Sequence, residues 1–214
     1  MINYLLELIY PNVCGLCNEI NKDSLCENCK LKLEKLDITK IDNYTDKNFN
    51  KHIYIFKYDK EIRKMLLDYK FNEKSYLYKT FSKIIIKNQK VCDFIKEYDM
   101  IIPVPLHKKR LKSRGYNQCE LIMKEVSKTN RYLKVNSNIL EKVKNSLPQS
   151  TLNKKERIEN IKEAYIVKNY ELIKNKKILI FDDIFTTGST VDECSRILMK
   201  YNPKEIGIFT IAKD

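Results

Sequence analysis

The sequence lacks any apolar segment long enough to cross a membrane, because a spanning helix needs about 20 mostly apolar residues in a row. The apolar opening stretch, residues 1–11, contains Glu7 and stops at Pro11. It also lacks the basic first segment of a secretory signal peptide. We therefore expect a short amphipathic helix at this end of the chain and a cytoplasmic protein.

Histidine is scarce, with two in the whole chain, and no internal repeat or low-complexity tract is present. His52 stands at the start of a predicted strand and carries no functional pattern. His107 lies in a basic segment, where a lone histidine is more often a hydrogen-bonding surface residue than a catalytic one. The histidines therefore do not by themselves predict a catalytic centre.

Length and charge set broad limits on the class of protein. A chain of 214 residues fits one full domain with a small appendage, and a hydrophobic content of 43% is enough for a packed core. The net charge of +13 suits polyphosphate ligands or nucleic acid. Lys, Asn and Ile are abundant throughout, as an AT-rich genome would produce, so the charge is also compatible with a solvated surface.

Four of the seven cysteines form two Cys-x₂-Cys pairs near the start of the chain. Two such pairs complete a tetrahedral zinc site, with the ligands Cys14, Cys17, Cys26 and Cys29. Two redox pairs are the alternative, but no thioredoxin-like pattern accompanies them. Because so short a segment cannot form its own hydrophobic core, zinc would supply its folding free energy.

We expect this zinc-knuckle module to cover residues 1–45 and a second domain to cover residues 46–214. The boundary is a predicted polar loop over residues 37–51, rich in Asn, Asp and Lys. The remaining cysteines sit singly in apolar helical patterns and are expected to pack in the core: Cys92, Cys119 and Cys194.

Residues 176–190 predict a phosphate site. Residues 178–181 form an apolar run typical of a buried parallel strand, which ends in two adjacent carboxylates, Asp182 and Asp183. The first-turn N–H groups of a following helix favour an anion. Small and hydroxyl residues fill the turn between strand and helix: Thr186, Thr187, Gly188, Ser189 and Thr190. Since carboxylates accept hydrogen bonds from vicinal hydroxyls, the stretch predicts a ribose 5-phosphate site at the edge of an α/β sheet.

Three other interpretations of the acidic pair fit less well. A haloacid-dehalogenase motif separates its aspartates by one residue, whereas Asp182 and Asp183 are adjacent. A receiver domain needs a later strand with the phospho-acceptor, and too little chain follows. An ordinary strand–turn–helix has no need of five consecutive small or hydroxyl residues. Instead, the stretch resembles the phosphoribosyl-pyrophosphate (PRPP) signature of type I phosphoribosyltransferases.

Two further segments are candidates for contacting PRPP. Residues 100–105 predict a strand closed by prolines, and the basic loop after it holds Arg110 and Arg114, placed to grip a pyrophosphate. The polar stretch over residues 149–160 predicts a long loop of the kind that often closes over a site. Its candidate residues are Gln149, Arg157 and Asn160.

The remaining pattern alternates between helices and strands. Helices are predicted over residues 29–36, 60–70, 75–98 and 116–128, and strands over residues 52–58, 135–143, 164–167 and 205–212.

Together, the zinc knuckle, the basic segment, the polar loop and the PRPP signature resemble the ComF family of phosphoribosyltransferase-like proteins, which is linked to natural competence. The resemblance covers nearly the whole chain and is weakest over residues 35–95. It implies the type I phosphoribosyltransferase fold, a mostly parallel central sheet flanked by helices, with a small N-terminal zinc-binding module.

The resemblance also implies roles for individual residues. Asp182 and Asp183 would bind the ribose hydroxyls and act in catalysis together with Arg157, and PRPP would carry Mg²⁺. The other PRPP-binding residues would be Thr186, Thr187, Gly188, Ser189, Thr190, Arg110, Arg114 and Gln149.

Three functions are left open. The first is a competence protein that acts in DNA uptake, binds a PRPP-type ligand and handles single-stranded DNA with partners such as a helicase and DNA-processing proteins. The second is a metabolic phosphoribosyltransferase that transfers ribose 5-phosphate to a base or an amine. The third is a PRPP sensor without chemistry. No base-binding pattern stands between the knuckle and Met100, so the acceptor and enzymatic turnover are left open as well.

Overall fold

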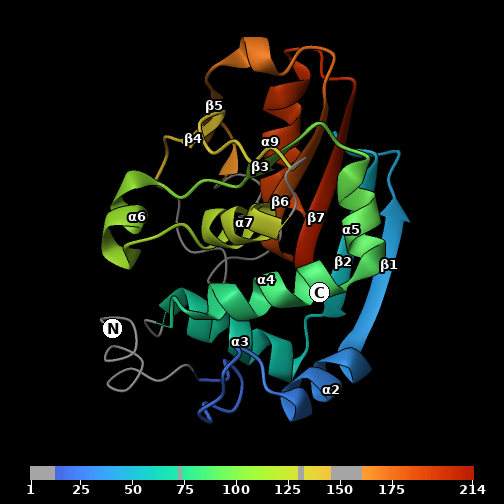
Figure 1. Ribbon diagram of the computed structural model, residues 1–214. Coiled ribbons are helices and arrows are strands. Elements are labelled where there is room, and N and C mark those ends of the chain that lie inside the picture. The colour runs from blue at the N-terminus through green and yellow to red at the C-terminus, as the bar shows by residue number, and fades with distance from the viewer. Residues whose placement is uncertain (1–12, 72–73, 130–132, 146–160) are drawn as a thin grey trace.

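The computed structural model describes residues 13–71, 74–129, 133–145 and 161–214 (Figure 1). The helix predicted within residues 1–11 lies outside these ranges, as do the candidate residues Gln149, Arg157 and Asn160. Among the described residues, no helix is both long enough and apolar enough to cross a membrane.

The described part of the chain contains a five-stranded sheet with the strand order β1-β2-β7-β6-β3. Strand β1 is antiparallel to β2, and the other neighbouring strands are parallel. The strands are β1 (Asp37–Asn43), β2 (Lys51–Lys57), β3 (Met100–Pro103), β6 (Lys177–Phe185) and β7 (Glu205–Lys213). This mostly parallel sheet, flanked by helices, confirms the predicted α/β class.

Both faces of the sheet are covered, so its central strands are apolar on both sides. On β6, Leu179 and Phe181 belong to one apolar cluster, whereas Ile178 and Ile180 belong to a second. The first cluster includes residues of α3 (Lys60–Phe71), α4 (Leu77–Lys87), α5 (Gln89–Lys96) and α7 (Gln118–Thr129). The second includes residues of α9 (Ser189–Met199), β4 (Leu140–Lys142) and β5 (Tyr165–Val167). Alternate residues of β6 therefore face different groups of elements.

The first cysteine turn packs directly against α4. A Cβ added to Gly15 would lie 2.3 Å from Thr80 Oγ1 and 2.5 Å from Leu77 Cδ2, so any larger residue would force these side chains to move. Thr80 Oγ1 donates a hydrogen bond to the carbonyl oxygen of Ser24 at 2.8 Å. Helix α2 (Glu27–Leu36) begins between the last two cysteines and buries Leu33. The knuckle is thus anchored to a helix of the main body.

The prediction of a polar loop over residues 37–51 is wrong in its first half, because Asp37–Asn43 forms β1. This strand lies at the edge of the sheet and most of its side chains are exposed. Its sequence therefore lacks the apolar alternation that marks a half-buried strand. Pairing of its backbone with β2 holds it in place.

Two other segments also differ from their predictions. The basic segment after β3 is helix α6 (Lys108–Arg114) instead of a loop, and Gly115 ends it with a φ of 83°. The strand predicted over residues 164–167 is β5, which pairs with β4 in a separate antiparallel ribbon outside the main sheet. Strands of three residues carry too little pattern to indicate which neighbour they pair with.

Candidate functional site

The acidic pair lies within β6, because this strand continues past both aspartates to Phe185. Side chains alternate along a strand, yet a carboxylate oxygen of each aspartate and Cys119 Sγ all lie within 4.8 Å of one another. Asp183 is buried, with 3% of its surface exposed, and contacts α3 and α7. Asp182 is only partly buried. The two carboxylates therefore have different surroundings.

Both carboxylate oxygens of Asp183 are engaged by side chains. Lys70 Nζ, from the last turn of α3, lies 2.8 Å from Oδ1, and Gln118 Nε2, at the start of α7, donates to Oδ2 at 3.1 Å. Gln118 Oε1 accepts a hydrogen bond from Arg114 Nη1 at 2.5 Å. Burial disfavours the charged form of Lys70, but the charge and hydrogen bond of Asp183, together with the charge of Asp182, outweigh burial and raise the pKa of Lys70. A continuous polar chain thus joins Lys70 to the basic helix α6.

Asp182 makes a different set of contacts. Its Oδ1 accepts hydrogen bonds from the backbone N–H of Asp183 at 2.9 Å and from the thiol of Cys119 at 3.6 Å. Burial, together with the charge of Asp183, raises the pKa of Asp182 from 3.8 to about 7, against the opposing effect of Lys70. Asp182 therefore changes its charge near neutral pH.

Cys119 was predicted to be only a packing residue. It is fully buried in the core cluster, as expected, but its thiol also donates to the acidic pair. Burial, reinforced by the charge of Asp182, raises the pKa of this thiol well above its usual value. Cys119 is therefore a neutral hydrogen-bond donor beside the carboxylates.

The turn after β6 leads into α9 through Gly188. Its backbone has a φ of 73°, and an added Cβ would lie 2.4 Å from the ring of Phe185, so glycine is required for both reasons. Thr187 Oγ1 and Ser189 Oγ lie 2.6 Å apart in a hydrogen bond. These hydroxyls stand at the N-terminus of an 11-residue helix, where first-turn N–H groups and the helix dipole favour an anion. We call residues 186–190 the cradle turn.

Helix α6 follows β3 at the same edge of the sheet at which the cradle turn follows β6, since these strands are parallel neighbours. In Figure 1, α6 lies on the side of the molecule opposite β1. Arg110 is partly buried, and burial together with the charge of Arg114 lowers its pKa. Burial and the charge of Arg110 likewise lower the pKa of Lys142 on β4. This concentration of cations beside the acidic pair suits a polyanionic ligand.

Lys70 was missed in the sequence, although the pattern of α3 contains a signal for it. The buried residues Ile62 and Leu66 are spaced four apart, and Lys70 is the next residue in this series. A lysine on the buried side of an amphipathic helix needs a charged or polar partner. Which partner it has could not be read from the sequence, because Asp183 is more than a hundred residues away along the chain.

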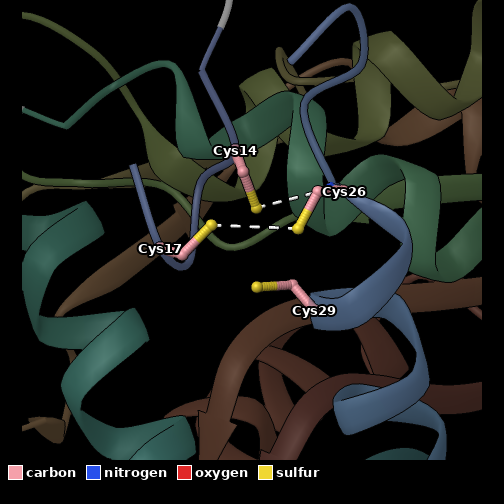
Figure 2. Close-up of side chains that lie close together, drawn as sticks. All are labelled: Cys14, Cys17, Cys26 and Cys29. Atoms are coloured by element: carbon pink, nitrogen blue, oxygen red, sulfur yellow. Dashed lines mark hydrogen bonds between the residues drawn. The ribbon is translucent and has the colours of Figure 1, made fainter. Parts of the chain in front are cut away.

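Figure 2 shows the thiol groups of Cys14, Cys17, Cys26 and Cys29 directed toward one another. Their Sγ atoms all lie within 4.8 Å of one another, and those of Cys17 and Cys26 are 3.8 Å apart. Four sulfurs at about 2.3 Å from a tetrahedral zinc ion would be about 3.8 Å apart. The donor set and its spacing therefore fit a four-thiolate metal site, and the cluster could hold a metal ion.

The mostly parallel sheet, flanked by helices, has the phosphoribosyltransferase-like fold. Residues 124–214 match the family model of the phosphoribosyl transferase domain. The matched region begins within α7 and includes the acidic pair, the cradle turn and α9.

Among curated proteins, the chain is similar to two competence proteins over most of its length. It is 26% identical to Competence protein F of Haemophilus influenzae over 217 residues, covering 91% of this chain and 92% of that protein. It is 26% identical to Competence protein ComFC of Streptococcus pneumoniae over 208 residues, covering 97% of this chain and 83% of that protein. These matches confirm the resemblance to the ComF family.

A third relative has a different name and a shorter match. The chain is 28% identical to DNA utilization protein YhgH of Escherichia coli over 116 residues. This match covers 54% of this chain and 49% of that protein.

Proposed function

We propose that this chain acts in natural competence, handling DNA that has reached the cytoplasm, and that it binds a PRPP-type ligand. The observation that carries this proposal is the similarity to two competence proteins over 91% and 97% of the chain. The relative named as a DNA utilization protein supports the link to DNA. A competence helicase and DNA-processing proteins are the proposed protein partners.

The PRPP-type ligand would lie along the edge of the sheet where β3 and β6 end. We assign its 5-phosphate to the cradle turn, its ribose to the acidic pair and its pyrophosphate to Arg110 and Arg114. Gln149 and Arg157 would belong to the loop that closes over it, and Arg157 would act in catalysis. The ligand would bring Mg²⁺ on its diphosphate oxygens, which suit a hard cation. Support comes from the combination of a helix N-terminus, a carboxylate pair and clustered cations at one edge.

Single-stranded DNA is the proposed second ligand, and helix α6 is the proposed contact. This helix carries five cations, Lys108, Lys109, Arg110, Lys112 and Arg114, in a chain with a net charge of +13. Such side chains contact phosphates and carry no sequence information, so binding would depend on salt and not on base sequence.

Zinc is the proposed metal of the four-cysteine cluster, where it would have a structural role. We also propose that the chain divides into the module 1–45 and the domain 46–214. The four cysteines all precede α2 or lie in its first turn, which supports a separate module. Strand β1, on the module's side of this boundary, pairs with β2 of the main sheet.

Phosphoribosyl transfer is the second candidate function. It is favoured by the match to the phosphoribosyl transferase domain, which includes the acidic pair and the cradle turn. In this reaction an acceptor nitrogen attacks C1 of the ribose, the bond from C1 to the pyrophosphate oxygen breaks, and pyrophosphate leaves. Release of pyrophosphate from PRPP, tested with bases, amines and single-stranded DNA, separates an enzyme from a PRPP sensor.

Deletion of the gene in its natural host tests the main proposal. Transformation by linear DNA should fall, and the wild-type gene supplied on a plasmid should restore it. A deletion strain that transforms as well as its parent contradicts the proposal. A strain that transforms normally but needs a purine or pyrimidine supplement favours the metabolic alternative.

A further inference from the structure

We propose that the two adjacent aspartates have different tasks: Asp182 contacts the ribose of the ligand, whereas Asp183, held by Lys70 and Gln118, is a positioning residue. This inference rests on the proposed PRPP-type site. It revises the expectation that both carboxylates bind the ribose hydroxyls, and it adds Lys70 and Gln118 to the residues on which the site depends.

The first argument is the engagement of Asp183. Lys70 Nζ lies 2.8 Å from one of its oxygens, and Gln118 Nε2 donates to the other at 3.1 Å. The side chain of Asp183 is 4% exposed and that of Lys70 is 18% exposed. A diol that replaced Lys70 would leave a partly buried ammonium without its partner, which is strongly destabilising. Asp183 is therefore poorly suited to bind a ligand reversibly.

The second argument is the accessibility of Asp182. Within the described parts of the chain, its hydrogen bonds are both made by Oδ1, to the Asp183 N–H and the Cys119 thiol. The residue is partly exposed, whereas Asp183 is buried, and no lysine or arginine bonds to Asp182 among the described residues. A carboxylate with an oxygen to spare can accept hydrogen bonds from two vicinal hydroxyls. Asp182 is therefore the member of the pair that can meet a ribose.

The third argument is the link from Asp183 to the pyrophosphate end of the site. Gln118 bonds Asp183 through Nε2 and accepts from Arg114 through Oε1. The backbone carbonyl of Gln118 also accepts a hydrogen bond from Tyr69 OH at 2.9 Å. Gln118 is thus held at three points and sets the separation between Asp183 and the Arg114 guanidinium. The unit Lys70–Asp183–Gln118 fixes the backbone from which Asp182 projects.

Two ligands distinguish the loss of a ribose contact from the loss of the whole site. They are PRPP with Mg²⁺ and inorganic pyrophosphate with Mg²⁺, which lacks the ribose. Calorimetric titration should show that Asp182→Asn weakens PRPP binding roughly 100-fold, or about 2.8 kcal/mol, and leaves pyrophosphate binding unchanged. Lys70→Met should weaken PRPP binding about tenfold, and Lys70→Arg should restore most of it. Lys64→Met, at an exposed position of the same helix, is the matched control and should bind as the wild type does.

Asp183→Asn completes the test. It should weaken PRPP binding as much as Lys70→Met does. The double variant Lys70→Met/Asp183→Asn should lose no more affinity for PRPP than either single variant, because both changes break the same unit. The inference is overturned if Asp182→Asn and Asp183→Asn lose the same affinity for PRPP while Lys70→Met binds PRPP as the wild type does. If the wild type binds neither ligand, the proposed function fails instead, and the two failures are distinguishable.

Discussion

Asp182 and Asp183 are neighbours in the chain, yet the pleat of β6 gives them different partners. Asp183 forms an ion pair with Lys70 at 2.8 Å, whereas Asp182 is affected by burial and by the negative charge of Asp183. Its pKa is consequently raised from 3.8 to about 7. Lys70 and Cys119 act to lower the pKa of Asp182. The charge of Asp182 in turn acts to raise the pKa values of Lys142, Tyr165 and Cys194, which face it from β4, β5 and α9.

The raised pKa of Asp182 predicts how stability depends on pH. The folded state binds this proton more tightly than the unfolded state, so the free energy of unfolding should fall as pH rises from about 4 to about 7, by at most about 1.4 kcal/mol per pH unit. Asp182→Asn removes this effect. The variant should therefore be more stable than the wild type at pH 8, by up to a few kcal/mol, and about equally stable near pH 4.

Chemical denaturation at both pH values measures this difference. Asp46→Asn, which removes an exposed carboxylate, is the control and should change little at either pH. A stability difference for Asp182→Asn that is the same at pH 4 and pH 8 would contradict the assigned pKa.

At the residue scale, the sequence predicted candidate site residues where they lie close together in the chain. The cysteine pairs and residues 182–190 could be recognised because their spacing alone brings their groups together. Lys70 and Gln118 could not be assigned, since only the tertiary fold carries α3 and α7 to Asp183. The positions of Gln149 and Arg157 in a closing loop stay predictions.

The four-cysteine knuckle, for which zinc is the proposed metal, is the first element with a direct test. Protein purified without chelators should contain one zinc ion per chain, and Cys17→Ser should lose it because one of four thiolate ligands is gone. The knuckle should then become more sensitive to protease, while the far-ultraviolet circular dichroism of the sheet domain is retained. Metal analysis by mass spectrometry, with Cys92→Ser as the control outside the cluster, gives the result.

Less than half an equivalent of zinc in fully reduced wild-type protein would argue against the site. So would a Cys17→Ser variant that keeps its full zinc content.

Helix α6 is the second element with a direct test. Lys109 and Lys112 are exposed on it, so the double variant Lys109→Glu/Lys112→Glu should bind single-stranded oligonucleotides more weakly. The slope of log affinity against log salt should also decrease by about one for each lost phosphate contact. Lys60→Glu/Lys64→Glu, which changes the net charge equally on α3, is the matched control.

Fluorescence anisotropy between low and physiological salt measures both quantities. Wild-type binding that barely changes with salt would exclude an electrostatic contact. If the α6 and α3 variants lose the same affinity for single-stranded oligonucleotides, binding depends on net charge and not on a specific contact with α6.

At the element scale, apolar periodicity predicted α3, which buries one face, and β3, β6 and β7, which are buried on both sides of the sheet. Strand β1 was missed because its side chains are mostly exposed and its backbone pairing leaves no mark on the sequence. Helix α6 was predicted as a loop because all of its residues are exposed or partly buried, so no apolar stripe marks it. Apolar periodicity in the sequence therefore indicates which elements are buried, and it does not identify elements that are mostly exposed.

At the scale of the whole molecule, the sheet brings together segments that lie far apart in the chain. Pro103 pairs with Phe181, so the segment after β3 and the cradle turn after β6 meet at one edge. The ribbon of β4 and β5 flanks the same region through contacts with α9. This convergence was predictable, since ligands bind at the carboxyl ends of parallel strands. The docking of the knuckle on α4 was not, because it depends on the fit of Gly15 against Thr80 and Leu77.

Binding of PRPP tests the central claim most directly, because the whole arrangement of carboxylates, cradle turn and basic helix is interpreted as a site for it. PRPP with Mg²⁺ should stabilise the folded state by about 2.7 kcal/mol at a hundred times its dissociation constant, and ribose 5-phosphate should act more weakly. Gly188→Val, which would crowd the cradle turn against Phe185, should abolish the binding.

Titration calorimetry is the decisive measurement, since a melting temperature also responds to the relief of charge repulsion between the aspartates. We expect saturable heat from the wild type with PRPP and Mg²⁺, at one ligand per chain, and none from Gly188→Val. Absence of heat from the wild type at millimolar PRPP would contradict the account and leave the protein as a scaffold without a working ligand site.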